Sequence, residues 1–126
     1  MNILKFGIAG YGKMGRIREK TISRCLNAEL VAIYEINNHT FEDESVIDCK
    51  SFEDLISLEI DAIFISSYVS SAAEYTIRAL NFGKHVFCEK PPSMSHDEML
   101  EVQKAEIKTG KVLKYGFNHR YHYSVM

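Results

Sequence analysis

Short apolar runs alternate with segments of helical periodicity along the whole chain. The pattern predicts six strands, at residues 3–9, 30–36, 46–49, 61–66, 85–88 and 112–117. It predicts helices at residues 13–27, 52–58 and 70–82, and a last one from Ser95 to near Gly110. Strands that alternate with helices favour a parallel sheet joined by right-handed crossovers. We therefore expect an α/β fold.

Two local features sharpen this expectation. The run at residues 61–66 is almost entirely apolar, which is typical of a strand covered on both faces of a sheet. Ser95 and Glu98 form the Ser-x-x-Glu pattern of a capping box, which marks the start of a helix. The predicted fold is a doubly wound parallel sheet of about six strands with helices on both faces.

Composition and charge narrow the range of functions. The chain has 126 residues, of which 46% are hydrophobic and 25% charged, and its formal net charge is −2. Charges of both signs are interspersed without a basic stripe, which argues against a nucleic-acid partner. No apolar run reaches the roughly 18 residues needed to span a bilayer. The first residues lack a signal peptide pattern, so we expect a cytoplasmic protein with no membrane partner.

The cysteines and histidines do not form a metal-binding pattern. Cys25, Cys49 and Cys88 are scattered singly, and an odd number argues against a disulfide framework. Cys25 falls in a predicted helix and Cys88 in a predicted strand, so we expect small core residues at these positions. His119 and His122 are three apart without an evident third ligand, so we expect no metal.

The sequence AGYGKMG, at residues 9–15, carries the first chemical signal. Gly10, Gly12 and Gly15 form the pattern G-x-G-x-x-G between a predicted strand and a predicted helix. The first glycine would permit a tight turn, the second a close approach of backbone to a pyrophosphate, and the third close packing of the helix. The helix N-terminus would hold the phosphates. A plain strand-to-helix turn is the alternative, and the context favours dinucleotide binding.

An acidic residue supports this interpretation. Glu35 ends the second predicted strand, twenty residues after Gly15. At this place in a dinucleotide fold, an acid accepts hydrogen bonds from the adenosine ribose hydroxyls and repels a 2′-phosphate. The sequence therefore predicts NAD rather than NADP, although Lys13 could offset the charge of the acid. A solvated carboxylate in a polar loop is the alternative.

The segment HVFCEKPPS, at residues 85–93, ends an apolar strand with unusual chemistry. Glu89 and Lys90 follow the strand, and Pro91 and Pro92 prevent regular structure from continuing. Ligands of doubly wound sheets bind outside the carboxyl ends of the strands, where this segment is expected. From these residues alone, a functional pair and a surface ion pair at a strand end are equally well supported.

Several segments taken together are far more specific than any one of them. They are AGYGKMG, the acid Glu35, the lead-in ALNFGKHV, the segment GKHVFCEKPPS and the later GFNHRY. In this combination the chain resembles, over nearly its whole length, the Gfo/Idh/MocA family of nicotinamide-dependent sugar oxidoreductases. The Glu-Lys-Pro of GKHVFCEKPPS corresponds to the signature of that family.

The resemblance implies roles for individual residues. Lys90 is similar to the family's catalytic lysine, which lies beside the nicotinamide and contacts the substrate hydroxyl, where an ammonium stabilises a developing alkoxide. Glu89 would help to hold Lys90 and the nicotinamide ribose, and Pro91 would direct both side chains into the cleft. The other implied cofactor-binding residues are Gly10, Tyr11, Gly12, Lys13, Met14, Gly15, Glu35, Ser66, Ser67, Tyr68 and Asn118.

The chain departs from the family pattern after the fourth predicted strand. Family members often carry a Thr-Pro pair there and a histidine a few residues later, near the nicotinamide. This chain has Ser67 and Tyr68, and then Ala72. Ser67 still offers a hydroxyl to a cofactor. Tyr68 could stack on the cofactor or the substrate, or be an ordinary half-buried aromatic residue.

The resemblance also implies a second domain. Family members continue from a segment like FNHRYHYSVM into a crossover helix and a substrate domain, which supplies a general acid or base and the main oligomer interface. We therefore expect residues 1–117 to form the dinucleotide-binding domain, a doubly wound (Rossmann) parallel sheet ordered 3-2-1-4-5-6, and residues 118–126 to begin the crossover. The chain alone would be incomplete and inactive.

The expected function is that of the nucleotide-binding half of an NAD-dependent dehydrogenase. It would transfer hydride at a hydroxyl-bearing carbon of a sugar, polyol or sugar nucleotide, and the complete enzyme would be a homo-oligomer. An NAD-binding regulatory or sensor module without catalysis is one alternative, and a folded fragment with an unusable cleft is another. Glu89 and Lys90 argue against a sensor, because phosphate binding does not require them.

Overall fold

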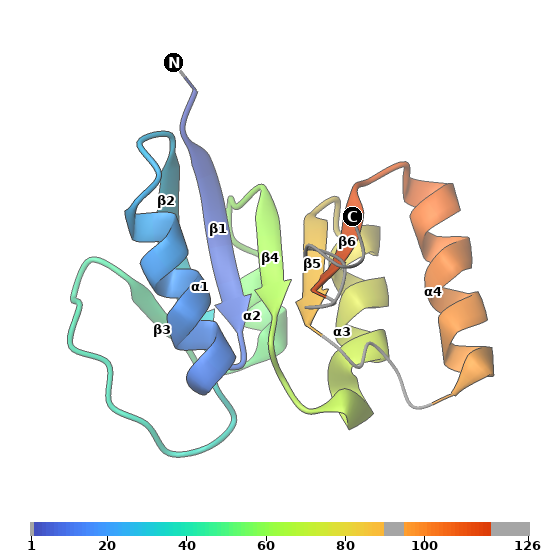
Figure 1. Ribbon diagram of the computed structural model, residues 1–126, viewed down its shortest axis with the longest axis horizontal. Helices are drawn as coiled ribbons and strands as arrows, with labels where there is room; N and C mark the ends of the chain where they lie inside the picture. The colour runs from blue at the N-terminus through green and yellow to red at the C-terminus, as the bar shows by residue number, and fades with distance from the viewer. Residues whose placement is uncertain (1, 90–94, 117–126) are drawn as a thin grey trace, which may run out of the picture.

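The strands and helices follow one another along the chain as the sequence pattern predicts (Figure 1). The computed structural model describes residues 2–89 and 95–116. The strands are β1 (Leu4–Ala9), β2 (Ala28–Tyr34), β3 (Ile47–Cys49), β4 (Ala62–Ile65), β5 (His85–Glu89) and β6 (Leu113–Gly116). The helices are α1 (Lys13–Ser23), α2 (Phe52–Ile56), α3 (Val69–Asn81) and α4 (His96–Thr109).

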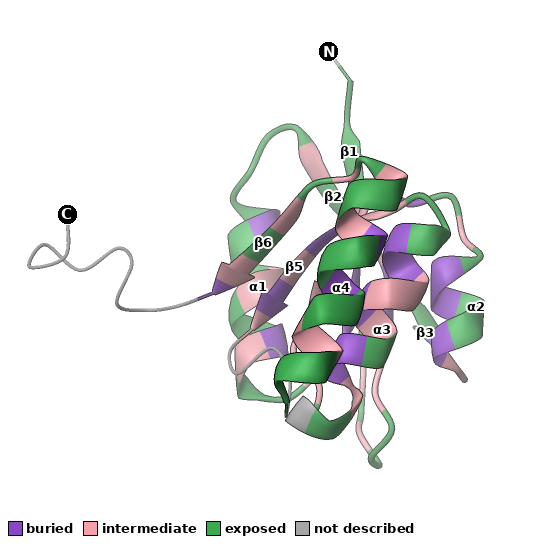
Figure 2. Ribbon diagram, turned by 90° about the vertical axis from the view of Figure 1, so that its right-hand side faces the viewer, coloured by how far each residue is buried: buried purple, intermediate pink, exposed green. Residues whose placement is uncertain are grey.

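All six strands run parallel, in the order β3-β2-β1-β4-β5-β6, which confirms the predicted doubly wound sheet. Helix α1 packs on β1 and β2 on one face of the sheet, whereas α2, α3 and α4 lie on the other face (Figure 2). Parallel strands end at the same edge of a sheet. The carboxyl ends of β1, β2, β4 and β5 therefore gather at one edge, where such folds bind their ligands.

Two apolar clusters join the sheet to its helices. The larger lies on the face of α2, α3 and α4, and its fully buried members include Leu55 and Leu80. The smaller lies under α1 and includes Ile8 and Ile22. Each fully buried side chain of this kind contributes about 1.5–3 kcal/mol. The sheet is thus a well-packed support for the loops at its carboxyl edge.

Helix α1 is shorter than predicted, and this changes the position of one cysteine. The helix ends at Ser23 rather than at residue 27, because the backbone N–H groups of Arg24 and Cys25 bond to carbonyls three residues earlier and tighten the last turn. The carbonyl of Asn27 already accepts a bond from the Leu4 N–H at 2.8 Å, so the chain has joined the sheet. Cys25 is exposed, and the prediction that it is a core residue is wrong.

The other predictions for single elements are confirmed more closely. Cys88 in β5 is fully buried. The Ser95 hydroxyl oxygen accepts a hydrogen bond from the Glu98 N–H at 3.1 Å, as the capping pattern predicts, and α4 ends at Thr109 with Gly110 as its C-cap. None of the helices in the described part of the chain is long and apolar enough to cross a membrane.

Candidate functional site

Four neighbouring strands are in register at the carboxyl edge of the sheet, and this register aligns four residues of the site. Ala9 of β1 is aligned with Tyr34 of β2 and with Ile65 of β4, and Ile65 is aligned with Cys88 of β5. The residues that come next, in the spatial order of the strands, are Glu35, Gly10, Ser66 and Glu89. The register therefore brings together three segments that the sequence singled out separately.

The glycine-rich turn between β1 and α1 is tightly packed at its first and third glycines. Gly10 has a φ of +96°, and a Cβ there would lie 2.5 Å from the backbone carbon of Ser66. A Cβ at Gly15 would lie 2.1 Å from the carbonyl oxygen of Gly10. Both positions thus require glycine for the reasons that the G-x-G-x-x-G pattern suggests.

The second glycine of the turn is different, because the space around it is open. Gly12 is the N-cap of α1, it is exposed, and a Cβ there would meet no atom within 4 Å among the described residues. It makes no side-chain cap bond, and the first turn of α1 holds no acidic residue. The helix thus presents free N–H groups and its positive dipole end, an arrangement that suits an anion. Lys13, exposed, and Met14, half-buried, form the beginning of this helix.

Glu35 connects the glycine-rich turn to the loop that follows β2. One carboxylate oxygen accepts a hydrogen bond from the Tyr11 N–H at 2.7 Å, and the other accepts one from the Asn37 N–H at 2.9 Å. The side chain is therefore fixed beside Gly10 and Gly12, as expected for the acid of a dinucleotide site.

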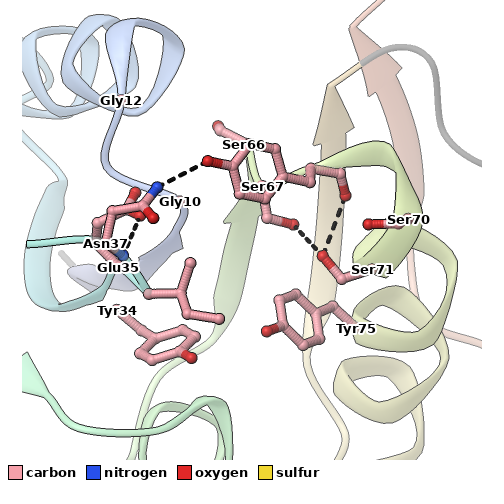
Figure 3. A pocket seen from close by; sticks show the side chains of 12 residues that line it. Gly10, Gly12, Tyr34, Glu35, Asn37, Ser66, Ser67, Ser70, Ser71 and Tyr75 are labelled. Carbon is pink, nitrogen blue, oxygen red and sulfur yellow. Dashed lines mark hydrogen bonds between the residues drawn. The ribbon is translucent and has the colours of Figure 1, made fainter.

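A cavity of about 330 Å³ opens between this loop and the start of α3. Figure 3 shows Glu35 and Asn37 on one side of it and Ser67, Ser71 and Tyr75 on the other. The lining residues are Gly10, Gly12, Tyr34, Glu35, Ile36, Asn37, Ser66, Ser67, Tyr68, Ser70, Ser71 and Tyr75. Burial, followed in importance by the neighbouring Tyr34, raises the pKa of Tyr75 to about 12, so this wall stays uncharged at neutral pH.

Tyr68 stands at the mouth of this cavity. It is the N-cap of α3 and 62% exposed, and its hydroxyl accepts a hydrogen bond from the Asn37 side-chain amide at 2.8 Å. The bond joins the loop after β2 to the start of α3 across the cavity. Tyr68 is thus not a half-buried aromatic residue but an exposed one, positioned at the entrance.

Tyr11 faces the other side of the turn, where the loop after β2 folds back. Its hydroxyl donates to the Glu19 carboxylate at 2.5 Å, and its ring meets that of Phe41 edge-on at 5.0 Å. Burial and then the bond to Glu19 raise the pKa of Tyr11 to about 12. The Arg16 guanidinium lies 5.3 Å above the same ring. A shallow hollow lined by Tyr11, Arg16, Glu35 and His39 continues the site in this direction.

Glu89 has a partner that the sequence did not suggest. Its carboxylate accepts a hydrogen bond from Nε of Arg18 on α1 at 2.5 Å, and both side chains are largely buried. Three predicted site residues, Lys90, Pro91 and Asn118, lie outside the described residues.

The residues that sequence analysis missed include Asn37, Ser71, Tyr75 and Arg18. None belongs to a recognisable local pattern, because each is brought to the site by contacts between distant parts of the chain.

The residues around the cavity fit a dinucleotide. The hydroxyl of Ser66 is buried and has no hydrogen-bond partner among the described residues, so a polar ligand group would satisfy it. Next to it, the open N-terminus of α1 fits a phosphate. The described residues contain no group of three or more His, Cys, Asp or Glu that could hold a metal ion.

An all-parallel sheet in this order, with a glycine-rich turn into the first helix and an acid after the second strand, defines the Rossmann class of domain. Residues 4–117 match the family described as "Oxidoreductase family, NAD-binding Rossmann fold". The chain therefore belongs to the Gfo/Idh/MocA family of oxidoreductases, as its sequence motifs predicted.

Individual relatives agree with this assignment. The chain is 36% identical to the uncharacterized oxidoreductase YrbE of Bacillus subtilis, over 91% of this chain and 36% of that protein. It is 35% identical to glucose-6-phosphate 3-dehydrogenase of B. subtilis, over 93% of this chain and 34% of that enzyme. A structure of scyllo-inositol dehydrogenase from Lactobacillus casei with bound cofactor NAD(H) and scyllo-inositol superposes with a TM-score of 0.87, at 27% identity, covering 98% of this chain and 38% of that one. The chain thus spans about a third of the length of its curated relatives.

Proposed function

We propose that this chain is the cofactor-binding half of a dehydrogenase that uses NAD(H) in preference to NADP(H). The observation that carries the proposal is the position of Glu35, whose carboxylate is held beside the cavity by the N–H groups of Tyr11 and Asn37. An ionised carboxylate offers about four acceptor sites, so two remain for ribose hydroxyls. A 2′-phosphate would meet a fixed negative charge.

The other parts of a dinucleotide have matching positions along the same edge. The pyrophosphate would lie at the open N-terminus of α1, at Gly12, with the ammonium of Lys13 near it. The hydroxyl groups of Ser66 and Ser67 would bind the cofactor beyond the pyrophosphate, and Tyr68 would cover the adenosine side of the cofactor. When bound, a nicotinamide cofactor supplies the acceptor or donor of a hydride.

The relatives and the family motif support the substrate class that we propose. The relatives named above include dehydrogenases of glucose 6-phosphate and of scyllo-inositol, both of which carry secondary hydroxyl groups on a ring. Hydride transfer at a hydroxyl-bearing carbon of a sugar, polyol or sugar nucleotide is the reaction that we assign to the complete enzyme. Lys90 would stabilise the substrate oxygen, with Glu89, Pro91 and Asn118 beside it.

Because the chain spans about a third of its relatives, we assign the rest of the substrate site to the remainder of the protein. Residues 1–117 would be the dinucleotide-binding domain, and residues 118–126 would begin the connection to the substrate domain. Homo-oligomers of the complete enzyme would form through that second domain.

The proposal is tested by titrating the chain with NADH and with NADPH and following the fluorescence of the reduced nicotinamide. We expect NADH to bind more tightly. Glu35→Ala should weaken NADH binding by about tenfold or more, since hydrogen bonds to a charged group contribute about 1.5–3 kcal/mol. The same variant should bind NADPH as well as, or better than, the wild type.

Glu29→Ala is the matched control, because Glu29 is an exposed acid near the opposite end of β2. It should leave both affinities unchanged. A wild-type preference for NADPH would refute the assignment of NAD. Failure of the chain to bind either nucleotide would refute the proposed cofactor-binding role.

A further inference from the structure

We propose that Arg18 is a positioning residue that holds the carboxylate of Glu89 in place for the nicotinamide end of the cofactor. The inference rests on the proposed function. It starts from a contact between residues that are 71 positions apart: Nε of Arg18 on α1 donates to a carboxylate oxygen of Glu89, the last residue of β5, at 2.5 Å. The side chains of Arg18 and Glu89 are only 20% and 10% exposed.

The guanidinium of Arg18 is fixed by aromatic rings as well as by this bond. It lies 4.6 Å from the ring centroid of Phe87 and 6.0 Å from that of Phe64. Alternate residues of a strand point to the same face, so Phe87 and Glu89 of β5 both project toward the side of the sheet that carries α1. Cation–π contact of this kind favours a planar guanidinium, so lysine would not replace this residue.

The other oxygen of Glu89 is confined by strand β6. Glu89 is paired with Gly116, and a Cβ at Gly116 would lie 2.7 Å from that oxygen and 3.0 Å from the Phe87 ring. Glycine therefore leaves just enough room for the carboxylate. Elements α1, β5 and β6 together determine its orientation.

The place of Glu89 in the row of strand ends indicates which part of the cofactor it faces. The row runs from Glu35 through Gly10 and Ser66 to Glu89. If Glu35 binds the adenosine ribose and the phosphates lie near Gly12, then Glu89 lies at the nicotinamide side. A carboxylate that is already fixed loses no rotamer freedom when it accepts bonds from a ribose, which favours binding.

The inference is tested on the chain by comparing two ligands. NADH carries the nicotinamide and its ribose, and ADP carries neither. Arg18→Met keeps the length and the packing on Phe87 but removes the charge and the donor. We expect it to raise the Kd for NADH about five- to tenfold, while the Kd for ADP, measured by titration calorimetry, changes by less than about twofold. Glu89→Gln should act in the same direction.

The double variant Arg18→Met, Glu89→Gln should bind NADH no more weakly than Glu89→Gln alone, because both changes disrupt one interaction. Arg24→Met removes an exposed arginine at the C-cap of α1 and should change neither Kd. Equal weakening of NADH and ADP by Arg18→Met would show a merely structural role, and an unchanged Kd for NADH would show no role. A wild-type chain that bound neither ligand would refute the proposed function, and this inference with it.

Discussion

Gly10 and Gly12 are two residues apart in the same turn, yet the structure makes opposite demands on them. Gly10 combines a positive φ with backbone atoms of Ser66 immediately beside its missing side chain. Gly12 has an ordinary φ of −87° and open space in place of a side chain. The first glycine is therefore required by the fold, whereas the second is free to serve a ligand.

This contrast gives a prediction for stability. Gly10→Ala should lower the free energy of unfolding by about 3 kcal/mol or more, because the left-handed conformation and the backbone overlap both oppose a side chain. Gly12→Ala should lower it by less than about 1 kcal/mol, since alanine is only a poorer N-cap. Urea unfolding of the two variants measures the difference.

The same pair separates folding from binding. Gly12→Ala should remain folded and yet bind NADH more weakly, because its methyl group would occupy the space of the pyrophosphate. Equal stability of the two alanine variants would contradict this account of the turn.

Single residues of the site were predictable where their role depends on local spacing. The glycines and Glu35 are recognisable from the sequence because turn, helix start and acid follow one another at fixed intervals. Arg18 was not recognisable, since α1 carries several other charges and the partner lies 71 positions away. The bond between Asn37 and Tyr68 likewise depends on how two loops meet across the cavity.

At the scale of elements, the connection between β2 and β3 is the least regular part of the described chain. Phe41 holds it to the glycine-rich turn through the edge-on contact with Tyr11. His39 holds it to the sheet: one ring nitrogen meets the carbonyl of Asn37 at 2.8 Å, and the other meets the carboxylate of Asp48, in β3, at 2.9 Å. The pKa of His39 is raised above 6.5, most strongly by the contact with Asn37 and next by that with Asp48.

This connection should therefore respond to pH. A histidine whose pKa is raised on folding adds stability that is complete below its unfolded pKa and is lost as the pH rises through its folded pKa. We expect the stability of the wild type relative to His39→Gln to fall as the pH rises from below 6.5 through the raised pKa of the folded histidine. The change should be less than about 1 kcal/mol, because the pair with Asp48 is partly exposed to solvent. Thermal unfolding of both proteins across this range measures it, and a difference that is independent of pH would contradict the role of His39.

Element types followed from the sequence more reliably than element ends. The ten predicted strands and helices are all present, because apolar periodicity reports directly which face of an element is buried. The end of α1 was placed four residues too late and the start of β2 two residues too late. Both errors arise in residues 24–29, where hydrogen bonds to β1 and within a tight turn outweigh helical propensity.

At the scale of the whole molecule, the strand order was predictable because the glycine-rich turn and the acid indicate a dinucleotide-binding domain, which has a characteristic strand order. Which helices cover each face of the sheet was less evident from the sequence. Helix α1 packs mainly on β1 and β2 and also contacts β4, while three helices share the other face (Figure 2). It is this arrangement that allows Arg18 to reach across to Phe87 and Glu89 on α1's side of the sheet.

Because the three cysteines differ in burial, the rates at which their thiols are modified report on the opening of the sheet. Cys25 is exposed, whereas Cys49 and Cys88 are buried, and burial raises the pKa of each buried thiol to about 11. Because the thiolate is the reactive form, an aromatic disulfide reagent should modify one cysteine at once. The other two should react only as fast as β3 and β5 become transiently accessible. NADH should slow the reaction at Cys88, which precedes Glu89, and simultaneous labelling of all three thiols would show that the sheet is not closed around them.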